Sequence, residues 1–467
     1  MKLGIERYRY KPIIIVMIYS LVTIYLFEFG VVNFQGYDKF TLYLFLFFAH
    51  MGMLFGYFYG MNSKSCSPGA DAKDGKALLH TLFKYSFVIC LITFIPNYMV
   101  QTHNFTFTLS DMTSKIQVGL ANSSELYNAN RDVENVSGIW KIINIGLVLT
   151  GFARWTFFPL SVYLWNELKN YHKIFFFIFA AFYLASFLAT GTTAGIFTIS
   201  FITIVPFVMK TSRQKCCFEM EYKRKQTNKR TKIISYGAIL GGISASLWIF
   251  GNNMDSRMGW DNDNIITTGW SSLPWSVVPD SLRPATYWLT GYLAQGYNAL
   301  SYCIDLPFTS TFGLGGSWFL MDNFSSLLNI NILQYTYLDK AEQFGIGAYH
   351  NWHTVYVWIA NDVSFFGVPI VLFVLFYLMA QSWRDYLVNN DPFAFIFMTI
   401  MGFFCLYISA NNTVFTHSDT LFAFWIILFA WKRYKGIYRY DQQLAEATET
   451  RNSWTTETEE VCLKGKA

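Results

Sequence analysis

The sequence predicts an all-α, polytopic membrane protein with about ten transmembrane helices and one large outward loop that carries amphipathic helices. Three observations predict this fold class. Hydrophobic residues make up 53% of the 467 residues and charged residues only 14%, whereas soluble domains carry about 25% charged residues. Apolar runs of about 17–25 residues, long enough to cross a bilayer, recur along the chain. The lysines and arginines gather in alternate connecting segments.

Ten apolar runs are the expected spans. The first is too long for the apolar core of a signal peptide and lacks a small-residue cleavage site, so we expect it to remain as a helix. Apolar residues 174–209 are too many for one crossing, and the break from Thr190 to Gly195 divides them into a hairpin. The expected spans are residues 12–34, 40–60, 85–102, 142–165, 174–190, 193–209, 233–250, 364–382, 394–410 and 418–433.

The distribution of basic residues predicts the orientation. With the N-terminus in the cytoplasm, the inner segments hold 27 of the 35 lysines and arginines. Cytoplasmic loops of membrane proteins carry such an excess, so both termini are expected to be cytoplasmic. The basic segment 210–232 is then expected to face anionic lipid headgroups, and the net charge of +5 gives no indication of nucleic-acid binding.

The chain divides into four parts by this reading. Residues 1–250 form a bundle of helices one to seven, residues 251–363 a periplasmic loop, residues 364–433 helices eight to ten, and residues 434–467 a cytoplasmic tail.

Within the loop, segment 284–304 is apolar but broken by polar residues, and it predicts an amphipathic helix on the outer surface. The alternative is a span, which would need a second crossing at 317–334. Segment 313–316 is glycine-rich but lacks the lysine of a phosphate loop, so we expect a plain flexible turn.

The composition of the outer loop suits a glycan. Seven of the fifteen tryptophans lie between residues 251 and 363, where acidic residues outnumber basic ones. Aromatic rings stack on the apolar faces of sugars, and carboxylates and amides bind sugar hydroxyls. The alternative reading of these aromatic residues is a belt at the membrane interface.

Arg154 lies near the middle of the fourth expected span. A guanidinium at that depth costs several kcal/mol unless it faces a wet cavity or a partner, so a functional role is the default expectation. The alternative is a structural ion pair with Glu28, an acidic residue of the first span.

Arg257 and Arg283 are the only arginines in the large outer loop. A guanidinium binds phosphate oxygens through two parallel hydrogen bonds, which suits a lipid-linked diphosphate. The alternative for each is a surface ion pair with Asp255 or Asp280, which would contribute little to stability.

His350 and His353 come just before the eighth expected span, and Asp362 follows nine residues after His353. A histidine with a pKa near neutrality could take a proton from an attacking sugar hydroxyl. We expect no metal, because a paired-histidine site would need a third ligand and only Asp362 is near. His103 and His417 are lone outer histidines and are expected to be structural.

The chain resembles the bacterial oligosaccharide repeat-unit polymerases of the Wzy type, which make O-antigen and exopolysaccharides. Three stretches carry this resemblance: residues 290–297 with 312–317, residues 352–354 through 360–363 and Gly367, and the hairpin at 190–195. The many spans, inside termini and single late outer loop are also similar.

The resemblance implies a metal-independent inverting glycosyltransferase of the bacterial inner membrane, with no cofactor. Its partners would be undecaprenyl-diphosphate-linked donor and acceptor oligosaccharides, membrane lipid and a chain-length regulator. Tyr292, Gln295, Tyr297 and Trp352, which lie in the resembling stretches, are then expected to contact sugar.

The expected mechanism places the donor diphosphate against Arg154 and a loop arginine, Arg257 or Arg283. His353, or failing that His350, would be the base, with Asp362 as its orienting partner.

Many relatives have an arginine in the Thr-Gly-Thr hairpin, where this chain has Thr192 and Thr193. Two other functions stay open. An O-antigen ligase also places a His-Asn pair before a late span, which His350-Asn351 resembles. A flippase or other transporter of lipid-linked oligosaccharides would show internal repeats and broken paired helices, and the sequence shows neither.

Overall fold

The fold was analysed in a computed structural model, which describes residues 8–63, 72–103, 105, 107–122, 139–192, 194–218, 248, 250, 251, 254, 268–348 and 351–434. Within these residues every regular element is a helix and there is no strand. Seven helical segments are long and apolar enough to cross a membrane. They are α2 (Lys11–Phe29), α3 (Lys39–Asn62), α4 (Ala72–Gln101), α7 (Ile139–Thr150) continued by α8 (Phe152–Tyr163), α9 (Asn170–Leu188), α10 (Ala194–Phe218) and α15 (Val355–Asn389).

The expected all-α membrane fold is confirmed, but the count of ten spans is not. Most of the expected span 233–250 lies outside the described residues. Two further expected spans correspond to shorter helices, α16 (Pro392–Leu406) and α18 (Ser418–Tyr434). The break within 174–209 is confirmed, because α9 ends at Leu188 and α10 begins at Ala194.

Local sequence explains where several helices begin. Asp38 and Asp391 precede α3 and α16, and each side chain accepts hydrogen bonds from two main-chain N–H groups of the first turn. Thr354 caps α15 through the N–H of Val357. Such side chains satisfy donors that would otherwise be unpaired at a helix start. Pro12 and Pro392 occupy the first turns of α2 and α16, where proline is tolerated.

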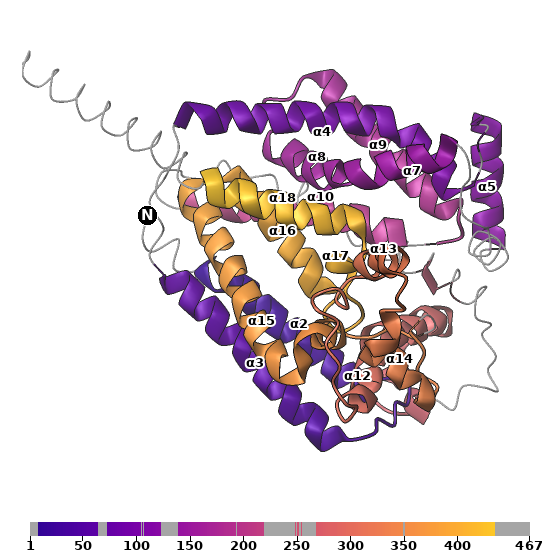
Figure 1. The fold of residues 1–467 in the computed structure, drawn as a ribbon. Coiled ribbons are helices and arrows are strands. Elements are labelled where there is room, and N and C mark those ends of the chain that lie inside the picture. Colours follow the sequence, from indigo (N-terminus) through magenta and orange to yellow (C-terminus); the bar gives the residue numbers. More distant parts are fainter. Residues whose placement is uncertain are drawn as a thin grey trace, which may run out of the picture.

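The helices form two groups that meet at α16. In Figure 1, α3 and α15 run side by side, and α4, α8, α9 and α18 lie across the other side of the molecule. α2 packs against α12 (Arg283–Cys303), and α8 contacts α4, α10, α16 and α18. α16 is in contact with both α15 and α8 and so joins the two groups.

Three glycines bring α3 and α15 into direct backbone contact. Gly52, Gly56 and Gly60 recur every four residues on one face of α3. A Cβ built on Gly56 would lie 2.2 Å from the main-chain oxygen of Phe373, and one built on Gly52 or Gly60 would lie 2.4 or 2.5 Å from an α15 carbonyl oxygen. Small residues at this spacing let membrane helices approach closely. This glycine seam is therefore a main contact of the first helix group.

α15 is interrupted near its N-terminal end. Ser364 has φ of +60° and ψ of 169°, so residues 355–363 and 365–389 are two helical pieces joined at a break. A left-handed φ is unusual for a residue other than glycine and is retained only where the surroundings enforce it. The helix also begins at Val355, earlier than the expected boundary at residue 364.

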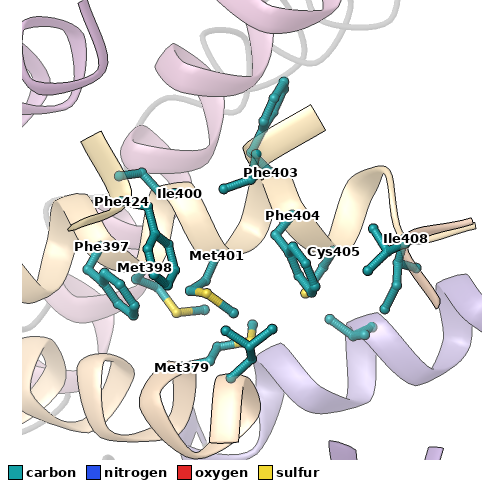
Figure 2. Close-up of a cluster of buried hydrophobic side chains, with 14 of the residues drawn as sticks. Met379, Phe397, Met398, Ile400, Met401, Phe403, Phe404, Cys405, Ile408 and Phe424 are labelled. Atoms are coloured by element: carbon teal, nitrogen blue, oxygen red, sulfur yellow. The ribbon is translucent and has the colours of Figure 1, made fainter. Parts of the chain in front are cut away.

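The core around α16 is apolar and rich in phenylalanine and methionine. Figure 2 shows Met398 and Met401 of α16 directed toward Met379 of α15, with Phe397 and Phe424 nearby. Phe397 also stacks on Trp431 of α18 at 5.2 Å between ring centroids. Flexible methionine side chains fill irregular gaps in such a core.

Basic side chains gather at one end of the bundle. Four of them, from α10, α15 and the segment before α2, donate hydrogen bonds to main-chain carbonyls at or near the C-terminal ends of helices. Helix C-termini favour cations because their last carbonyls are unpaired and carry partial negative charge. The bonds run from Arg9 to Met61, from Lys210 to Val162 and Tyr163, from Arg213 to Tyr386 and from Arg384 to Gly60.

The opposite end carries the 21-residue helix α12 and several short helices, none of them among the seven membrane-spanning candidates. Segment 284–304 forms α12, which packs on α2 through a hydrogen bond of 3.0 Å between Tyr297 and Thr23. Segment 317–334 contains an 11-residue helix, α13, too short for the second crossing considered above. The elements there are α5 (Leu109–Ala121), α13 (Trp318–Leu328), α14 (Tyr337–Lys340), α17 (Thr413–Thr416) and 3-10 turns at Thr268–Ser271, Trp275–Val277, Asp280–Leu282, Leu333–Tyr335 and Ala341–Phe344.

Candidate functional site

The connection between α16 and α18 carries polar groups to the end of the bundle where the glycine-rich loop lies. α16 has 15 residues and α18 has 17, so at 1.5 Å per residue they are about 22 and 26 Å long, a little shorter than a bilayer core of about 30 Å. In segment 407–417, which joins them, Asn412 donates to the carbonyl of Gly316 at 2.7 Å, and the carbonyl of Ile408 accepts from the N–H of Val355 at 3.1 Å.

Arg154 meets the start of α18. Its guanidinium forms an ion pair with the carboxylate of Asp419, and the indole Nε1 of Trp155 donates to the same carboxylate at 2.9 Å. The guanidinium also lies over the ring of Tyr183, 4.5 Å from its centroid. Gly151 makes this approach feasible, because a Cβ there would lie 2.6 Å from the Cβ of Asp419.

The expected alternative partner of Arg154 is elsewhere. Glu28 accepts hydrogen bonds from Lys39, at 3.0 Å, and from Tyr43. The structural pair considered from the sequence is thus replaced by the pair of Arg154 with Asp419. The carboxylate partner of Arg154 is therefore Asp419, and the Nε atom of Arg154 has no hydrogen-bond partner.

A cavity of about 190 Å³ opens beside this ion pair. Helices α4, α7, α8 and α9 and the start of α18 form its wall. The polar lining side chains are Thr93, Asn97, Tyr98, Gln101, Asn144, Thr150, Arg154, Tyr183, Ser186, Ser418 and Asp419. So many polar groups within membrane-length helices are typical of a site or a water-filled path.

Arg154 and Asp419 retain access to this cavity. Their side chains are 23% and 18% exposed although both lie deep among the helices. His417, two residues before Asp419, is exposed. Many protein atoms nevertheless lie around its imidazole, so the ring is partly desolvated. Burial lowers the pKa of His417, the carboxylate of Asp419 raises it and Arg154 lowers it, with a net shift downward. This shift favours the neutral imidazole, which is the form that a proton acceptor needs.

His353 has a different environment. It is 2% exposed, and neither ring nitrogen has a hydrogen-bond partner of acceptable geometry. Burial lowers the pKa of His353 to about 4, opposed only in part by the nearby main chain of Gly347. The imidazole is neutral but enclosed, so in this conformation it cannot reach a sugar hydroxyl.

Asp362 anchors the glycine-rich loop and makes no hydrogen bond to His353. Its carboxylate accepts hydrogen bonds from the main-chain N–H groups of Gly313, Gly315 and Gly316, at 2.9–3.0 Å, and from the hydroxyl of Thr311. Several donors fix both carboxylate oxygens. The expected plain flexible turn is thus a fixed loop, and Asp362 is occupied in holding it.

Arg283 forms the surface pair that was the alternative reading. It contacts Asp280 at 2.9 Å and lies over Trp270, 5.3 Å from the ring centroid. Asp280 is 88% exposed, so this pair contributes little to stability. Arg257 and His350 lie outside the described residues.

The four residues expected to contact sugar are in two kinds of surroundings. Tyr292 and Trp352 are half-buried and their rings lie 5.0 Å apart, and Gln295 on the same helix is also half-buried. Tyr297 is fully buried and bonds Thr23. Tyr297 is therefore part of the contact between α12 and α2, whereas the other three remain accessible.

Arg154 and His353 lie toward the same end of the bundle. Trp155 packs against Phe403 near the end of α16, with the rings tilted and their centroids 4.8 Å apart. The N–H of Val355, two residues after His353, donates to the carbonyl of Ile408 at 3.1 Å. Both residues thus adjoin the segment where α16 ends, although no hydrogen bond joins them.

Asp419 and His417 were missed from the sequence as site residues. The signal was present, because His417-Ser418-Asp419 stands directly before an apolar run, as His353 and Asp362 do. Among the described residues, no three His, Cys, Asp or Glu side chains are grouped as metal ligands.

The fold and the site define an all-α, multi-pass type of membrane protein with a polar cavity among its helices. Comparison with known protein families, with curated proteins and with solved structures finds no match.

Proposed function

We propose that this protein polymerises lipid-linked oligosaccharide repeat units. It would transfer the growing glycan from undecaprenyl diphosphate to a hydroxyl of a new lipid-linked unit. The observation that carries this proposal is the accessible pair of Arg154 and Asp419 at the wall of a polar cavity, in helices otherwise suited to lipid. The sequence resemblance described above supports the reaction class.

The proposed reaction needs a cation and a proton acceptor. The bond between the anomeric carbon and the diphosphate oxygen breaks, and the acceptor hydroxyl oxygen bonds to that carbon from the opposite face. The electron pair leaves with the lipid diphosphate, and its negative charge is stabilised by a guanidinium placed in advance. Asp419 orients Arg154 and offsets much of its charge, so a second arginine from the outer loop, Arg257 or Arg283, is part of the proposal.

The proton of the acceptor hydroxyl passes to a histidine. His353, expected from the sequence, would have to leave its enclosed position, and His350 remains the other expected base. His417 is already exposed and adjoins the Arg154 pair. We therefore add His417 to the candidate bases and assign Asp362 to holding the loop at residues 313–316.

The proposed location is the bacterial inner membrane with both termini in the cytoplasm. The basic end described above supports this orientation, because cytoplasmic faces of membrane proteins carry an excess of lysine and arginine. The cavity and the outer helices would then face the periplasm, where donor and acceptor units and a chain-length regulator are expected.

A deletion strain tests the proposal directly. Gel analysis of surface polysaccharide should show a single repeat unit after deletion, and long chains after complementation with the wild type. Arg154→Lys should give short chains, because lysine keeps the charge but loses the fork geometry. Lys84→Ala, at an exposed cation on α4, is the matched control and should restore full length.

Each other outcome has a distinct meaning. Full-length polymer accumulating on its lipid carrier would indicate an O-antigen ligase, and repeat units retained at the cytoplasmic face would indicate a flippase. Unchanged chain length in the deletion strain would overturn the proposal.

A further inference from the structure

The α4 wall of the cavity carries a continuous polar stripe. Thr93, Asn97 and Gln101 follow one another at four-residue spacing on one face of α4, and Asn144 of α7 lines the same cavity. From Cys90, beside Arg154, to Gln101 the stripe is about 16 Å long at 1.5 Å per residue. Three carboxamides in one cavity give both hydrogen-bond donors and acceptors.

The cavity carries no net formal charge. Among its described lining residues, Arg154 and Asp419 are the charged pair, and the others are amides, hydroxyls, a thiol and apolar groups. An anion held beside the amide stripe would lack a countercharge, which is costly at low dielectric. A neutral ligand with several hydroxyls would be stabilised there without that penalty.

Two further observations indicate a polar ligand with an apolar face. The hydroxyl of Tyr98, whose side chain is 1% exposed, has no hydrogen-bond partner, although the Thr102 hydroxyl is near. An unpaired buried hydroxyl is rare and needs a partner. The rings of Phe94 and Phe182, 4.9 Å apart edge to face, line the same cavity and offer apolar surface.

We propose that this amide stripe is a subsite for one neutral sugar ring, with Asn97, Gln101 and Asn144 as its hydroxyl partners. The volume of about 190 Å³ is below the roughly 300–1,000 Å³ of sites for whole drug-sized ligands, so the cavity holds one part of a larger molecule. Resting on the proposed function, the ring is the donor sugar that is attached to the diphosphate, which itself lies toward Arg154.

Cysteine protection in lipid nanodiscs tests this subsite on the full-length protein. Val148→Cys places a thiol at the cavity wall, and Leu109→Cys, at a position that is 65% exposed on α5 outside the membrane-length segments, is the control for a thiol in water. Labelling by a charged methanethiosulfonate reagent is followed at each thiol by peptide mass spectrometry. The probes are octyl glucoside, octyl phosphate and octyl tetraethylene glycol ether, which share one tail and differ in headgroup.

Octyl glucoside at about ten times its Kd should slow labelling of the V148C thiol about tenfold, because occupied cavities are protected. It should leave labelling of the L109C thiol unchanged. The ether should protect neither. Adding Asn97→Ala or Asn144→Ala should weaken protection by the glucoside by about tenfold in Kd, as expected for loss of a buried hydrogen bond.

Three results would overturn the subsite: no labelling of the V148C thiol without ligand, equal protection by glucoside and ether, or stronger protection by octyl phosphate. None of these measurements needs glycosyltransferase activity. Protection by glucoside in a protein whose deletion leaves glycan length normal would refute the proposed function alone. Shortened glycan without protection by glucoside would refute the subsite alone.

Discussion

Arg154 and Asp419 form an ion pair across 265 residues of sequence, and the carboxylate also accepts a hydrogen bond from the indole of Trp155. The pair joins α8 to the first turn of α18. It therefore fixes the inner wall of the cavity as well as the direction of the guanidinium. The contribution of this ion pair to stability can be measured separately from its proposed role in binding the diphosphate.

We expect Asp419→Asn to destabilise the protein by about 3 kcal/mol, because removing one partner of a largely buried pair leaves the other charge uncompensated. The double variant Arg154→Met/Asp419→Asn should recover part of this loss, which is a coupling that a double-mutant cycle measures. Thermal unfolding in detergent gives both values. Asp280→Asn, in the exposed pair with Arg283, is the control and should cause no measurable change; additive effects at 154 and 419 would contradict the pairing.

Gly56→Ala should destabilise the glycine seam. The added methyl group would lie 2.2 Å from the carbonyl oxygen of Phe373, so the helices must separate. Overpacking of this kind costs about 1–3 kcal/mol. Gly146→Ala on α7, where a Cβ meets no atom within 4 Å, is the matched control and should be neutral. A melting temperature for Gly56→Ala equal to that of Gly146→Ala would show that α3 and α15 are not in backbone contact.

Asp362→Asn should release the loop at residues 313–316. An amide can accept with its oxygen, but its NH₂ group faces main-chain N–H donors and repels them. Leaving such donors unpaired costs about 1–3 kcal/mol. Limited proteolysis should then cut near Gly313 faster than in the wild type. Asp305→Asn, at an exposed carboxylate nearby, should leave the cleavage rate unchanged, and an equal rate in both variants would refute the anchoring role.

His353 predicts a pH dependence of stability. Its pKa is lowered to about 4 in the folded protein, against about 6.5 when unfolded, so between these values the unfolded chain binds more protons. The contribution of neutral His353 to the free energy of unfolding is complete above about pH 6.5. It is lost as pH falls toward 4, and the free energy of unfolding then decreases by up to about 1.4 kcal/mol per pH unit. Unfolding measured from pH 7 to pH 4.5 should show the same slope in the wild type and in His80→Gln, and a slope smaller by up to about 1.4 kcal/mol per pH unit in His353→Phe, where the other histidines with lowered pKa, such as His417, still contribute. An unchanged slope in His353→Phe would exclude His353 as its source.

Composition and apolar run length were sufficient to predict the membrane fold, since seven segments of the expected kind are present. The hairpin before Ala194 followed from turn residues within an apolar run. The glycine seam was not predicted, although Gly52, Gly56 and Gly60 have the spacing of a packing motif, because the sequence does not tell which helix faces them.

The candidate site was predicted in part. Arg154 stood out because a charge in a membrane span demands a partner, but the partner, Asp419, is 265 residues away. The roles of His353 and Asp362 depend on where their side chains point, which the sequence does not show. The imidazole of His353 is enclosed by packing, and the carboxylate of Asp362 points to a loop that lies 46 to 51 residues earlier in the chain.

The break at Ser364 separates two pieces of α15 that have different contacts. Below it, the glycine seam clamps residues 365–389 to α3. Above it, Asn361 and Asp362 are tied to the outer loop by side-chain hydrogen bonds. If the elements bound to residues 355–363 tilt during substrate exchange, we therefore expect the backbone to change direction at Ser364, while residues 365–389 stay packed against α3.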